Sequence, residues 1–218
     1  MKSPRTYWDT FETPYQMGKQ KHREYMLDLL KDKGVKSLFD DGCGTGPIYQ
    51  LIKDTTETTN DGVVFKRWEF IYKGTDYSPA MIEIATGQFP EATFEVQDAR
   101  KLSEESGTWD CVLLMHSLDH LDDYKAAIKE AARVSKKYVC IILWRSFTQE
   151  GTNLNPKNRM GKEEGEPDWE DTYLHEYSKE ALDEAFKEAG LVIEEIAEGE
   201  KLNSDSSHYN FLYLLKKI

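Results

Sequence analysis

The sequence predicts an α/β fold built on a doubly wound, mostly parallel seven-stranded sheet, with helices on both faces and an antiparallel C-terminal strand. Short apolar segments alternate with amphipathic segments along most of the chain, which is the pattern of strand–helix–strand units. The run YVCIILW is almost continuously apolar, as in a strand that is covered on both faces. A chain of 218 residues can bury a sizeable core, so we expect a single domain over residues 1–218.

The first predicted element is a helix over residues 19–33, within an N-terminal helical cap over residues 1–33. Its apolar side chains share one stripe, and Gly34 ends it. Residues 35–41, VKSLFDD, follow as a short buried strand. The stripe consists of Tyr25, Met26, Leu29 and Leu30.

This strand leads into the stretch FDDGCGTGP at residues 39–47, a glycine loop that precedes a predicted helix over residues 47–54. Pro47 suits the first helical turn, where a missing N–H group costs little. Residues 53–67 are polar and rich in threonine, so we expect an extended insertion loop that lengthens the link to the next strand.

The middle of the chain repeats the strand–helix pattern. Ser78 is expected to cap the helix that continues with Pro79, because its hydroxyl can accept a bond from a free N–H group of the first turn. The predicted strands cover residues 68–76, 92–98, 109–116 and 138–144, and the predicted helices cover residues 78–86 and 122–136.

Residues 146–175 interrupt this pattern with a segment rich in Gly, Asn, Pro and acidic residues. Loops of this length in a compact domain often act as lids or binding elements, so we expect a lid or substrate loop here. A helix over residues 178–190 and strands over residues 191–202 and 208–218 complete the fold. In the last strand, we expect every second side chain to face inward and its neighbours to face outward, the inward ones being Phe211, Tyr213 and Leu215.

Composition narrows the range of partners. The net charge of −12 argues against nucleic acid and anionic membranes, which require a basic surface. No long apolar segment is present and the N-terminal residues lack the apolar middle of a signal peptide, so we expect a cytoplasmic protein with no membrane contact. The cysteines form neither a CxxC pair nor a cluster with histidines, so we expect reduced thiols and no metal site. They are Cys43, Cys111 and Cys140.

The glycine loop predicts a ligand of a particular charge. Alternating glycines permit positive backbone angles and remove the side chains that would keep a ligand away from the main chain. The spacing is GxGxG, whereas dinucleotide-binding loops have GxGxxG and hold a pyrophosphate at the helix N-terminus. Because Asp40 precedes the glycines, an anionic ligand would be repelled, whereas a cationic or zwitterionic ligand would not.

These residues resemble the first motif of the class I S-adenosylmethionine-dependent methyltransferases, a Rossmann-like family in which an acid precedes three alternating glycines. The resemblance extends from about residue 36 to residue 145 and implies S-adenosyl-L-methionine as the cofactor. It implies that Asp40 binds the cofactor's amino group and that the loop packs against its methionine part. Asp41 departs from the family pattern and is either a second polar contact or a buried, hydrogen-bonded acid. The implied loop residues are Gly42, Cys43, Gly44 and Gly46.

Three further segments resemble later motifs of the same family, in the right order and on the expected elements. In the second, Asp76 would accept both ribose hydroxyls, and Tyr77 and Met81 would flank the adenine. In the third, Asp98 would bind the adenine amine and Ala99 would offer backbone contact. The alternative reading makes the acids turn or cap residues, and Tyr77 and Met81 ordinary core. The segments are YKGTDYSPAMIEIA, FEVQDARKL and WDCVLLMHSLDHLDD.

The fourth segment contains the candidate for catalysis. Ligands of open parallel sheets bind at the carboxyl ends of the strands, which Met115 and His116 reach. Methyl transfer mainly requires alignment of the reactants and exclusion of water, and a base matters only if the acceptor arrives protonated. We expect Met115 to contact the cofactor and His116 to face the substrate, as a base or otherwise as a packing histidine. Further candidates for substrate contact are Tyr15, His120, Arg145 and Trp169.

The sequence therefore predicts an S-adenosylmethionine-dependent methyltransferase that transfers a methyl group to a small-molecule acceptor by in-line displacement. The alternatives are a methyltransferase acting on protein or RNA, a non-catalytic regulator that binds S-adenosylmethionine, and an NAD-dependent dehydrogenase. The sequence does not identify the acceptor, the methylated atom or the oligomeric state.

Overall fold

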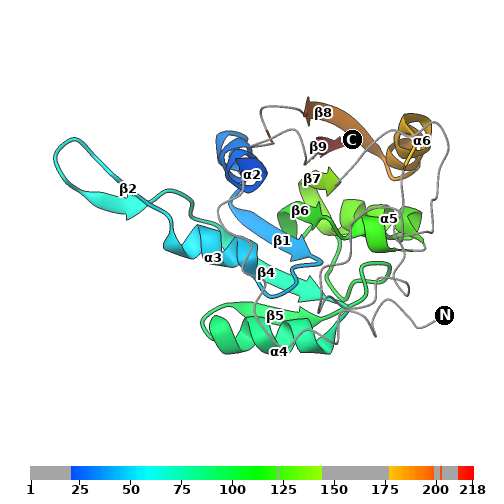
Figure 1. Ribbon diagram of the computed structural model, residues 1–218. Coiled ribbons are helices and arrows are strands. Elements are labelled where there is room, and N and C mark those ends of the chain that lie inside the picture. The colour runs from blue at the N-terminus through cyan, green and yellow to red at the C-terminus, as the bar shows by residue number, and fades with distance from the viewer. Residues whose placement is uncertain (1–20, 122, 144–176, 199–201, 203–210) are drawn as a thin grey trace, which may run out of the picture.

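A seven-stranded sheet forms the centre of the protein (Figure 1). The computed structural model describes residues 21–121, 123–143, 177–198, 202 and 211–218. The strand order is β5-β4-β1-β6-β7-β9-β8, in which β9 pairs antiparallel with both of its neighbours and the other neighbours pair parallel. The predicted fold class is confirmed. The strands are β1 (Ser37–Asp41), β4 (Ile71–Asp76), β5 (Thr93–Val96), β6 (Trp109–Met115), β7 (Ser135–Leu143), β8 (Leu191–Ala197) and β9 (Phe211–Lys217).

Helices cover both faces of the sheet. On one face, α2 and α3 pack with side chains such as Leu38 and Leu113, while α5 and α6 pack on the other with Phe39 and Leu114. Neighbouring residues divide between the two faces because side chains alternate along a strand. The helices are α2 (Lys21–Asp32), α3 (Pro47–Asp54), α4 (Pro79–Gln88), α5 (Tyr124–Val134) and α6 (Lys179–Glu188).

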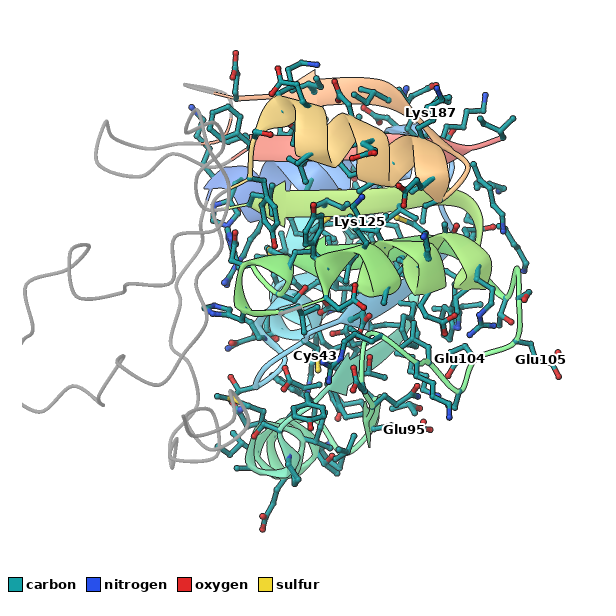
Figure 2. All side chains as sticks on the ribbon, turned by 90° about the vertical axis from the view of Figure 1, so that its right-hand side faces the viewer. Cys43, Glu95, Glu104, Glu105, Lys125 and Lys187 are labelled. Atoms are coloured by element: carbon teal, nitrogen blue, oxygen red, sulfur yellow. The ribbon has the colours of Figure 1, made fainter. Side chains whose placement is uncertain are left out.

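The helices α5 and α6 lie side by side over the face that Figure 2 turns toward the viewer. Lys125 of α5 joins them, since its ammonium lies 3.5 Å from Glu184 and 3.3 Å from Glu188 of α6. The predicted caps are present where the structure tests them. The hydroxyl of Ser78 accepts from Met81 N at 3.3 Å at the start of α4.

The last strand corrects one prediction. Both Leu212 and Leu214 are fully buried, although they alternate with Tyr213 and were expected to face outward. They belong to the core beneath α2 and α3, whereas Tyr213 belongs to the core beneath α5 and α6. An interior strand between two others, with helices on both faces, has no outward side, so alternation is not the pattern to expect from it.

Residues 53–67 also differ from expectation, because they contain a hairpin rather than an open loop. The strands β2 (Thr56–Thr58) and β3 (Val64–Lys66) pair antiparallel, and Figure 1 shows the hairpin projecting from the body of the protein. Thr59 N–H donates to the carbonyl of Val63 at 2.8 Å, and Gly62 has a φ of 86°. Asp-Gly between β-branched and aromatic residues is a hairpin signal, so the sequence contained the information.

Several predicted segments lie outside the described residues. They are the first part of the N-terminal cap, the lid or substrate loop over residues 146–175, and the substrate candidates Tyr15, Arg145 and Trp169. None of the helices in the described ranges has the length and hydropathy that crossing a bilayer requires.

Candidate functional site

The carboxyl ends of three neighbouring strands bring the predicted site residues to one edge of the sheet. Asp40 of β1 lies opposite Gly74 of β4 on one side and Leu113 of β6 on the other. The loops that follow these strands are therefore adjacent, which is where open parallel sheets bind ligands. This edge of the sheet contains the glycine loop, Asp76 at the end of β4 and His116 directly after β6.

The glycine loop is fastened to the end of β4. The N–H groups of Gly42 and Cys43 donate to the carbonyl of Thr75 at 2.7 and 2.8 Å. The N–H group of Gly44 donates to Asp76 Oδ2 at 2.9 Å, and Ser78 N–H donates to Oδ1 at 2.9 Å. Asp76 thus fixes the glycine loop to the end of β4.

The glycines of the loop meet different needs. A Cβ on Gly42 would lie 2.5 Å from Ser117 Cβ, and one on Gly46 would lie 3.1 Å from the Phe89 ring, so both allow close packing. A Cβ on Gly44, where φ is 53°, would meet no atom of the described residues within 4 Å. Gly44 is the loop glycine that faces open space, and a ligand can lie against its main chain.

The side chain of Cys43 does not face that space. It is buried, and its sulfur lies 2.9 Å from where a Cβ on Gly74 would be. Burial raises the pKa of the Cys43 thiol well above its usual range. Cys43 therefore contributes packing and backbone to the loop.

Asp40 has an oxygen that no described residue satisfies. Its side chain is 1% exposed, Tyr72 Oη donates to Oδ2 at 2.6 Å, and Oδ1 is buried without a hydrogen-bond partner among the described residues. Burial raises the pKa of Asp40 to about 7, while the Tyr72 hydrogen bond and the charge of Arg23 act in the opposite direction. An unsatisfied buried oxygen costs roughly 1–3 kcal/mol. A cationic group of a ligand would supply the missing partner.

Asp41 is a buried, hydrogen-bonded acid, one of its two predicted alternatives. Thr75 Oγ1 donates to Oδ1 at 3.1 Å, while Oδ2 has no partner in the part of the chain that the structure describes. Burial, reinforced by the nearby charges of Asp76 and Asp40, raises the pKa of Asp41 to about 8. Asp41 is therefore largely protonated at neutral pH and adds little negative charge to the edge.

The residues implied for the adenine differ in how accessible they are. Tyr77 is 40% exposed, whereas Met81 is 2% exposed and packs as ordinary core. Asp98 Oδ1 accepts from the backbone N–H and Nε of Arg100, both at 2.9 Å, and Oδ2 accepts from Nη2 at 2.8 Å. These bonds lower the pKa of Asp98. An adenine amine would share this carboxylate with Arg100, beside the buried Ala99.

His116 follows β6 in a backbone conformation that side chains rarely adopt. Its φ is 56°, and no other non-glycine residue in the described ranges has a positive φ. Its N–H group donates to the carbonyl of Ile142 at 2.8 Å, while the half-buried Met115 precedes it. Burial lowers the pKa of His116 well below its usual value, and the charges of neighbouring basic residues add to this effect. The imidazole is therefore neutral at physiological pH and can accept a proton.

His120 lies farther along, in the short 3-10 helix η1 (Leu118–His120). Because η1 begins only at Leu118, His116 and His120 are not on one continuous helical face. The described residues contain no group of three or more His, Cys, Asp or Glu side chains arranged to hold a metal ion.

Two site residues come from α2 and were missed by sequence reasoning. The rings of His22 and His116 meet edge to face with centroids 5.5 Å apart. Arg23, the next residue, is 3% exposed, and its charge acts on both Asp40 and His116. A signal was available, since both residues continue the buried stripe of α2 at a spacing of four, His22 before Met26 and Arg23 before Leu27.

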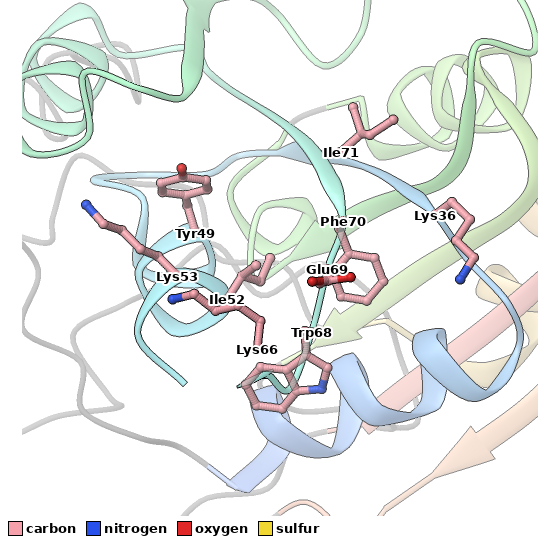
Figure 3. Close-up of a pocket in the computed structure, with 9 residues that line it drawn as sticks. All are labelled: Lys36, Tyr49, Ile52, Lys53, Lys66, Trp68, Glu69, Phe70 and Ile71. Carbon is pink, nitrogen blue, oxygen red and sulfur yellow. The ribbon is translucent and has the colours of Figure 1, made fainter. Parts of the chain in front are cut away.

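A groove of about 630 Å³ lies at the opposite edge of the sheet, where strands begin (Figure 3). Its floor contains Trp68 and Ile52, and exposed lysines surround it. It is remote from the glycine loop and belongs to the base of the hairpin. The lining residues are Lys36, Tyr49, Ile52, Lys53, Lys66, Trp68, Glu69, Phe70 and Ile71.

Comparisons with known proteins identify the family and the fold of the chain. Ajmaline N-methyltransferase of Rauvolfia serpentina is 27% identical over 118 residues, which cover 51% of this chain and 36% of the relative, so the match spans little more than a third of that relative's length. The structure of magnesium protoporphyrin IX methyltransferase from Synechocystis PCC 6803 with bound SAH is similar with a TM-score of 0.65 and 16% identity, over 98% of each chain.

Another structure with the same fold, the [4+2]-cyclase SpnF, has a TM-score of 0.63 and 17% identity, over 95% of this chain and 85% of its own. The sequence matches the family described as "Methyltransferase domain" over residues 15–196, far more than half of the chain. The protein therefore belongs to this methyltransferase family, whose Rossmann-like members use S-adenosyl-L-methionine as their cofactor.

Proposed function

We propose that this chain binds S-adenosyl-L-methionine at the carboxyl edge of the sheet and transfers its methyl group to a small-molecule acceptor. The observation that carries the proposal is that Asp40 and Gly44 occur together, at the end of β1 and in the loop that follows it. Among the described residues, Asp40 Oδ1 is buried without a partner, and no atom lies within 4 Å of where a Cβ on Gly44 would be. A ligand that carries positive charge and lies flat against the backbone satisfies both features.

The roles of the residues follow from their positions. Asp40 takes the ammonium group of the cofactor, and the main chain at Gly44 lies against its methionine part. Asp76, whose carboxylate also holds the N–H groups of Gly44 and Ser78, accepts the ribose hydroxyls. The adenine lies between the exposed ring of Tyr77 and the loop of Asp98 and Ala99, with Met115 on the side toward the sulfur.

The protein's part in the chemistry is mainly alignment and protection. S-adenosyl-L-methionine supplies, when bound, a methyl group on a positively charged sulfur, which is already an activated leaving group. The edge formed by the ends of β1, β4 and β6 orients the reactants and limits the access of water to the reacting atoms. His116 accepts the proton of a protonated acceptor at a ring nitrogen. Its lowered pKa keeps the imidazole free of a proton at neutral pH but also makes it a weak base.

Two features favour a small molecule as the acceptor over protein or RNA. The net charge of −12 disfavours RNA, which would need a basic surface. The similar proteins named above include an ajmaline N-methyltransferase and a magnesium protoporphyrin IX methyltransferase, both named for small molecules. Since a fold neighbour is named as a cyclase, the test must measure methyl transfer as well as cofactor binding.

Calorimetry with S-adenosylhomocysteine and NADH tests the first half of the proposal. We expect S-adenosylhomocysteine to bind and NADH to give no heat. Binding should be lost in Asp40→Ala and retained in Glu83→Gln, a matched control on the exposed side of α4. NADH binding without S-adenosylhomocysteine binding would overturn the proposal.

Transfer of a labelled methyl group tests the second half. The protein is incubated with tritiated S-adenosyl-L-methionine and a cell extract separated into low-mass, protein and RNA fractions. We expect label in the low-mass fraction, and less of it with His116→Ala at unchanged S-adenosylhomocysteine affinity. Label in the protein or RNA fraction would favour the alternative acceptors, and binding without any transfer would favour a regulator.

A further inference from the structure

We infer that two copies of this chain associate through the hairpin of β2 and β3 and the groove at its base, so that the hairpin of each copy lies in the groove of the other. This inference concerns the amino edge of the sheet and does not depend on the proposed function.

The hairpin is exposed to water over its whole length. Every residue of β2 and β3 is exposed, and Figure 1 shows the two strands projecting from the body of the protein. A two-stranded hairpin without further packing is only marginally stable in water. Three consecutive apolar residues, with 55%, 62% and 40% of their surface exposed, would be stabilised by a partner that covers them. They are Val63, Val64 and Phe65.

The groove is lined by side chains of a kind that suits such a strand. Figure 3 shows aromatic and aliphatic groups along it, among them Tyr49, Phe70 and Ile71. Ile71 is 70% exposed, and Phe70 and Tyr49 are half-buried. An apolar strand placed over these side chains would remove apolar surface from water on both partners.

The charges of the hairpin and the groove are complementary. The groove is lined by Lys36, Lys53 and Lys66, although the chain as a whole has a net charge of −12. Lys53 pairs with Glu91 at 2.6 Å, whereas no ion pair within the described residues involves Lys36 or Lys66. At the turn of the hairpin, Asp61 is exposed and has no ion pair with a described residue either. An acidic hairpin tip therefore fits a groove with available lysines.

The position of the groove allows both contacts to form in one dimer. The groove includes Lys66, the last residue of β3, and Trp68 just beyond it, so it lies at the base of the hairpin, whereas Asp61 lies at the tip. If two hairpins lie side by side in opposite directions, a two-fold axis through their midpoints places each tip at the base of the other. Such a contact uses the same surface on both copies and closes as a dimer.

This symmetry favours a second copy over other partners. One arrangement covers both exposed surfaces, and the chain itself supplies an apolar strand with an acidic tip. An anionic lipid surface would cover the apolar residues but would repel Glu57 and Asp61 of the hairpin.

Sedimentation velocity on the full chain, over a range of protein concentrations, tests the inference. We expect an equilibrium between monomer and dimer. Val64→Thr combined with Phe65→Thr keeps β-branched residues in β3 but removes apolar surface. It should raise the Kd of the dimer at least about tenfold, because each dimer contains the contact twice. Val192→Thr, at an exposed position of β8, is the matched control and should leave the Kd unchanged.

The lysines give a second measurement. Lys36→Gln should weaken the dimer by a smaller factor and should reduce the dependence of its Kd on salt concentration, because ion pairs near water are screened. Lys187→Gln, at an exposed position of α6, should change neither quantity. Circular dichroism checks that the variants are folded, independently of cofactor binding.

Three results would overturn the inference. The chain could remain monomeric up to about 0.1 mM, a concentration at which a stable dimer is fully formed. The dimer could form but be unaffected by the double change in β3, which would place its interface elsewhere. Alternatively, the monomer could sediment with phosphatidylserine vesicles and lose this binding in the double variant, which would assign the hairpin to a membrane surface.

Discussion

The two edges of the sheet both contain buried aspartates, but the carboxylate oxygens have partners at one edge and lack them among the described residues at the other. At the amino edge, Asp110 of β6 accepts from the N–H group of Lys36 at 2.9 Å and lies 3.2 Å from the ammonium of Lys137. At the carboxyl edge, Asp40 and Asp41 each have a buried oxygen without a partner among the described residues. The first edge satisfies its carboxylate internally, and the second leaves bonding capacity unused. Unused capacity of this kind indicates a ligand site.

The same contrast explains why we propose the carboxyl edge, and not the groove, as the functional site. It is hollow, but its lysines and Glu69 are exposed to water and lose little by having no ligand. At the carboxyl edge, Asp40 and Asp41 are removed from water, so a bound partner would stabilise the oxygens that no described residue satisfies. Buried polar groups therefore favour the carboxyl edge as the site, whereas volume alone would favour the groove.

The largest expected effect comes from Asp76, which holds the glycine loop and would also bind the ribose. Asp76→Ala removes the acceptor for Gly44 N–H and Ser78 N–H together with the acceptor for two hydroxyls. We expect S-adenosylhomocysteine affinity to fall about 100-fold, or about 3 kcal/mol, in calorimetry. Glu69→Ala, in the groove, is the control at the amino edge and should change the affinity less than about twofold. Equal effects of the two changes on the affinity would contradict the proposal that the ligand binds at the carboxyl edge.

The second prediction uses pH to distinguish the aspartates. The pKa of Asp41 rises from a usual value of 3.8 to about 8, so between these values the folded state holds a proton that the unfolded state has lost. Stability must therefore fall as pH rises through this window. Asn cannot ionise, so Asp41→Asn should raise the free energy of unfolding at pH 8.5 by at least about 2 kcal/mol and change it little at pH 4.

Asp110 should give the opposite dependence of stability on pH. Burial raises its pKa, but the Lys36 N–H group and the charge of Lys137 outweigh this and keep the pKa below its usual value. The ionised carboxylate of Asp110 therefore stabilises the folded protein above pH 4, and this stabilisation is lost as pH falls further. Asp110→Asn should therefore destabilise the protein at neutral pH, by about 1 kcal/mol. Urea unfolding at several pH values measures both variants, and the same sign for both would contradict the comparison.

Features that depend on residues close together in the sequence could be predicted, whereas features that depend on packing between distant segments could not. The fold class, the caps and the acid–glycine loop depend on residues close together in the sequence, and these predictions could be made from pattern and spacing. The hairpin was missed although Asp61 and Gly62 signal it locally. The burial of Leu212 and Leu214 was missed because alternation within one strand does not reveal a second layer of helices.

The site was predictable to a similar extent. The convergence of Asp40, Asp76 and His116 follows from the order of parallel strands. The contact of His22 with His116 depends on how α2 packs over the end of β6; the stripe of α2 predicts that His22 is buried, but not what it contacts. The bonds from Arg100 to Asp98 also modify the implied adenine contact, because they occupy a carboxylate that the motif leaves free.

The smallest expected effect compares two glycines in the same backbone region. Gly44 in the loop and Gly34 after α2 have φ values of 53° and 71°, and in the described part of the chain no atom lies within 4 Å of a Cβ at either position. Alanine should therefore strain both sites similarly, by about 1 kcal/mol. Gly34→Ala lies at the amino edge and should leave S-adenosylhomocysteine affinity unchanged, whereas Gly44→Ala places a methyl group where the ligand would lie and should weaken it by about tenfold. Thermal unfolding verifies the equal strain and calorimetry measures the affinities. Since the two variants carry the same cost in stability, any difference in affinity reports which edge the ligand occupies, and equal affinities would place the ligand away from Gly44.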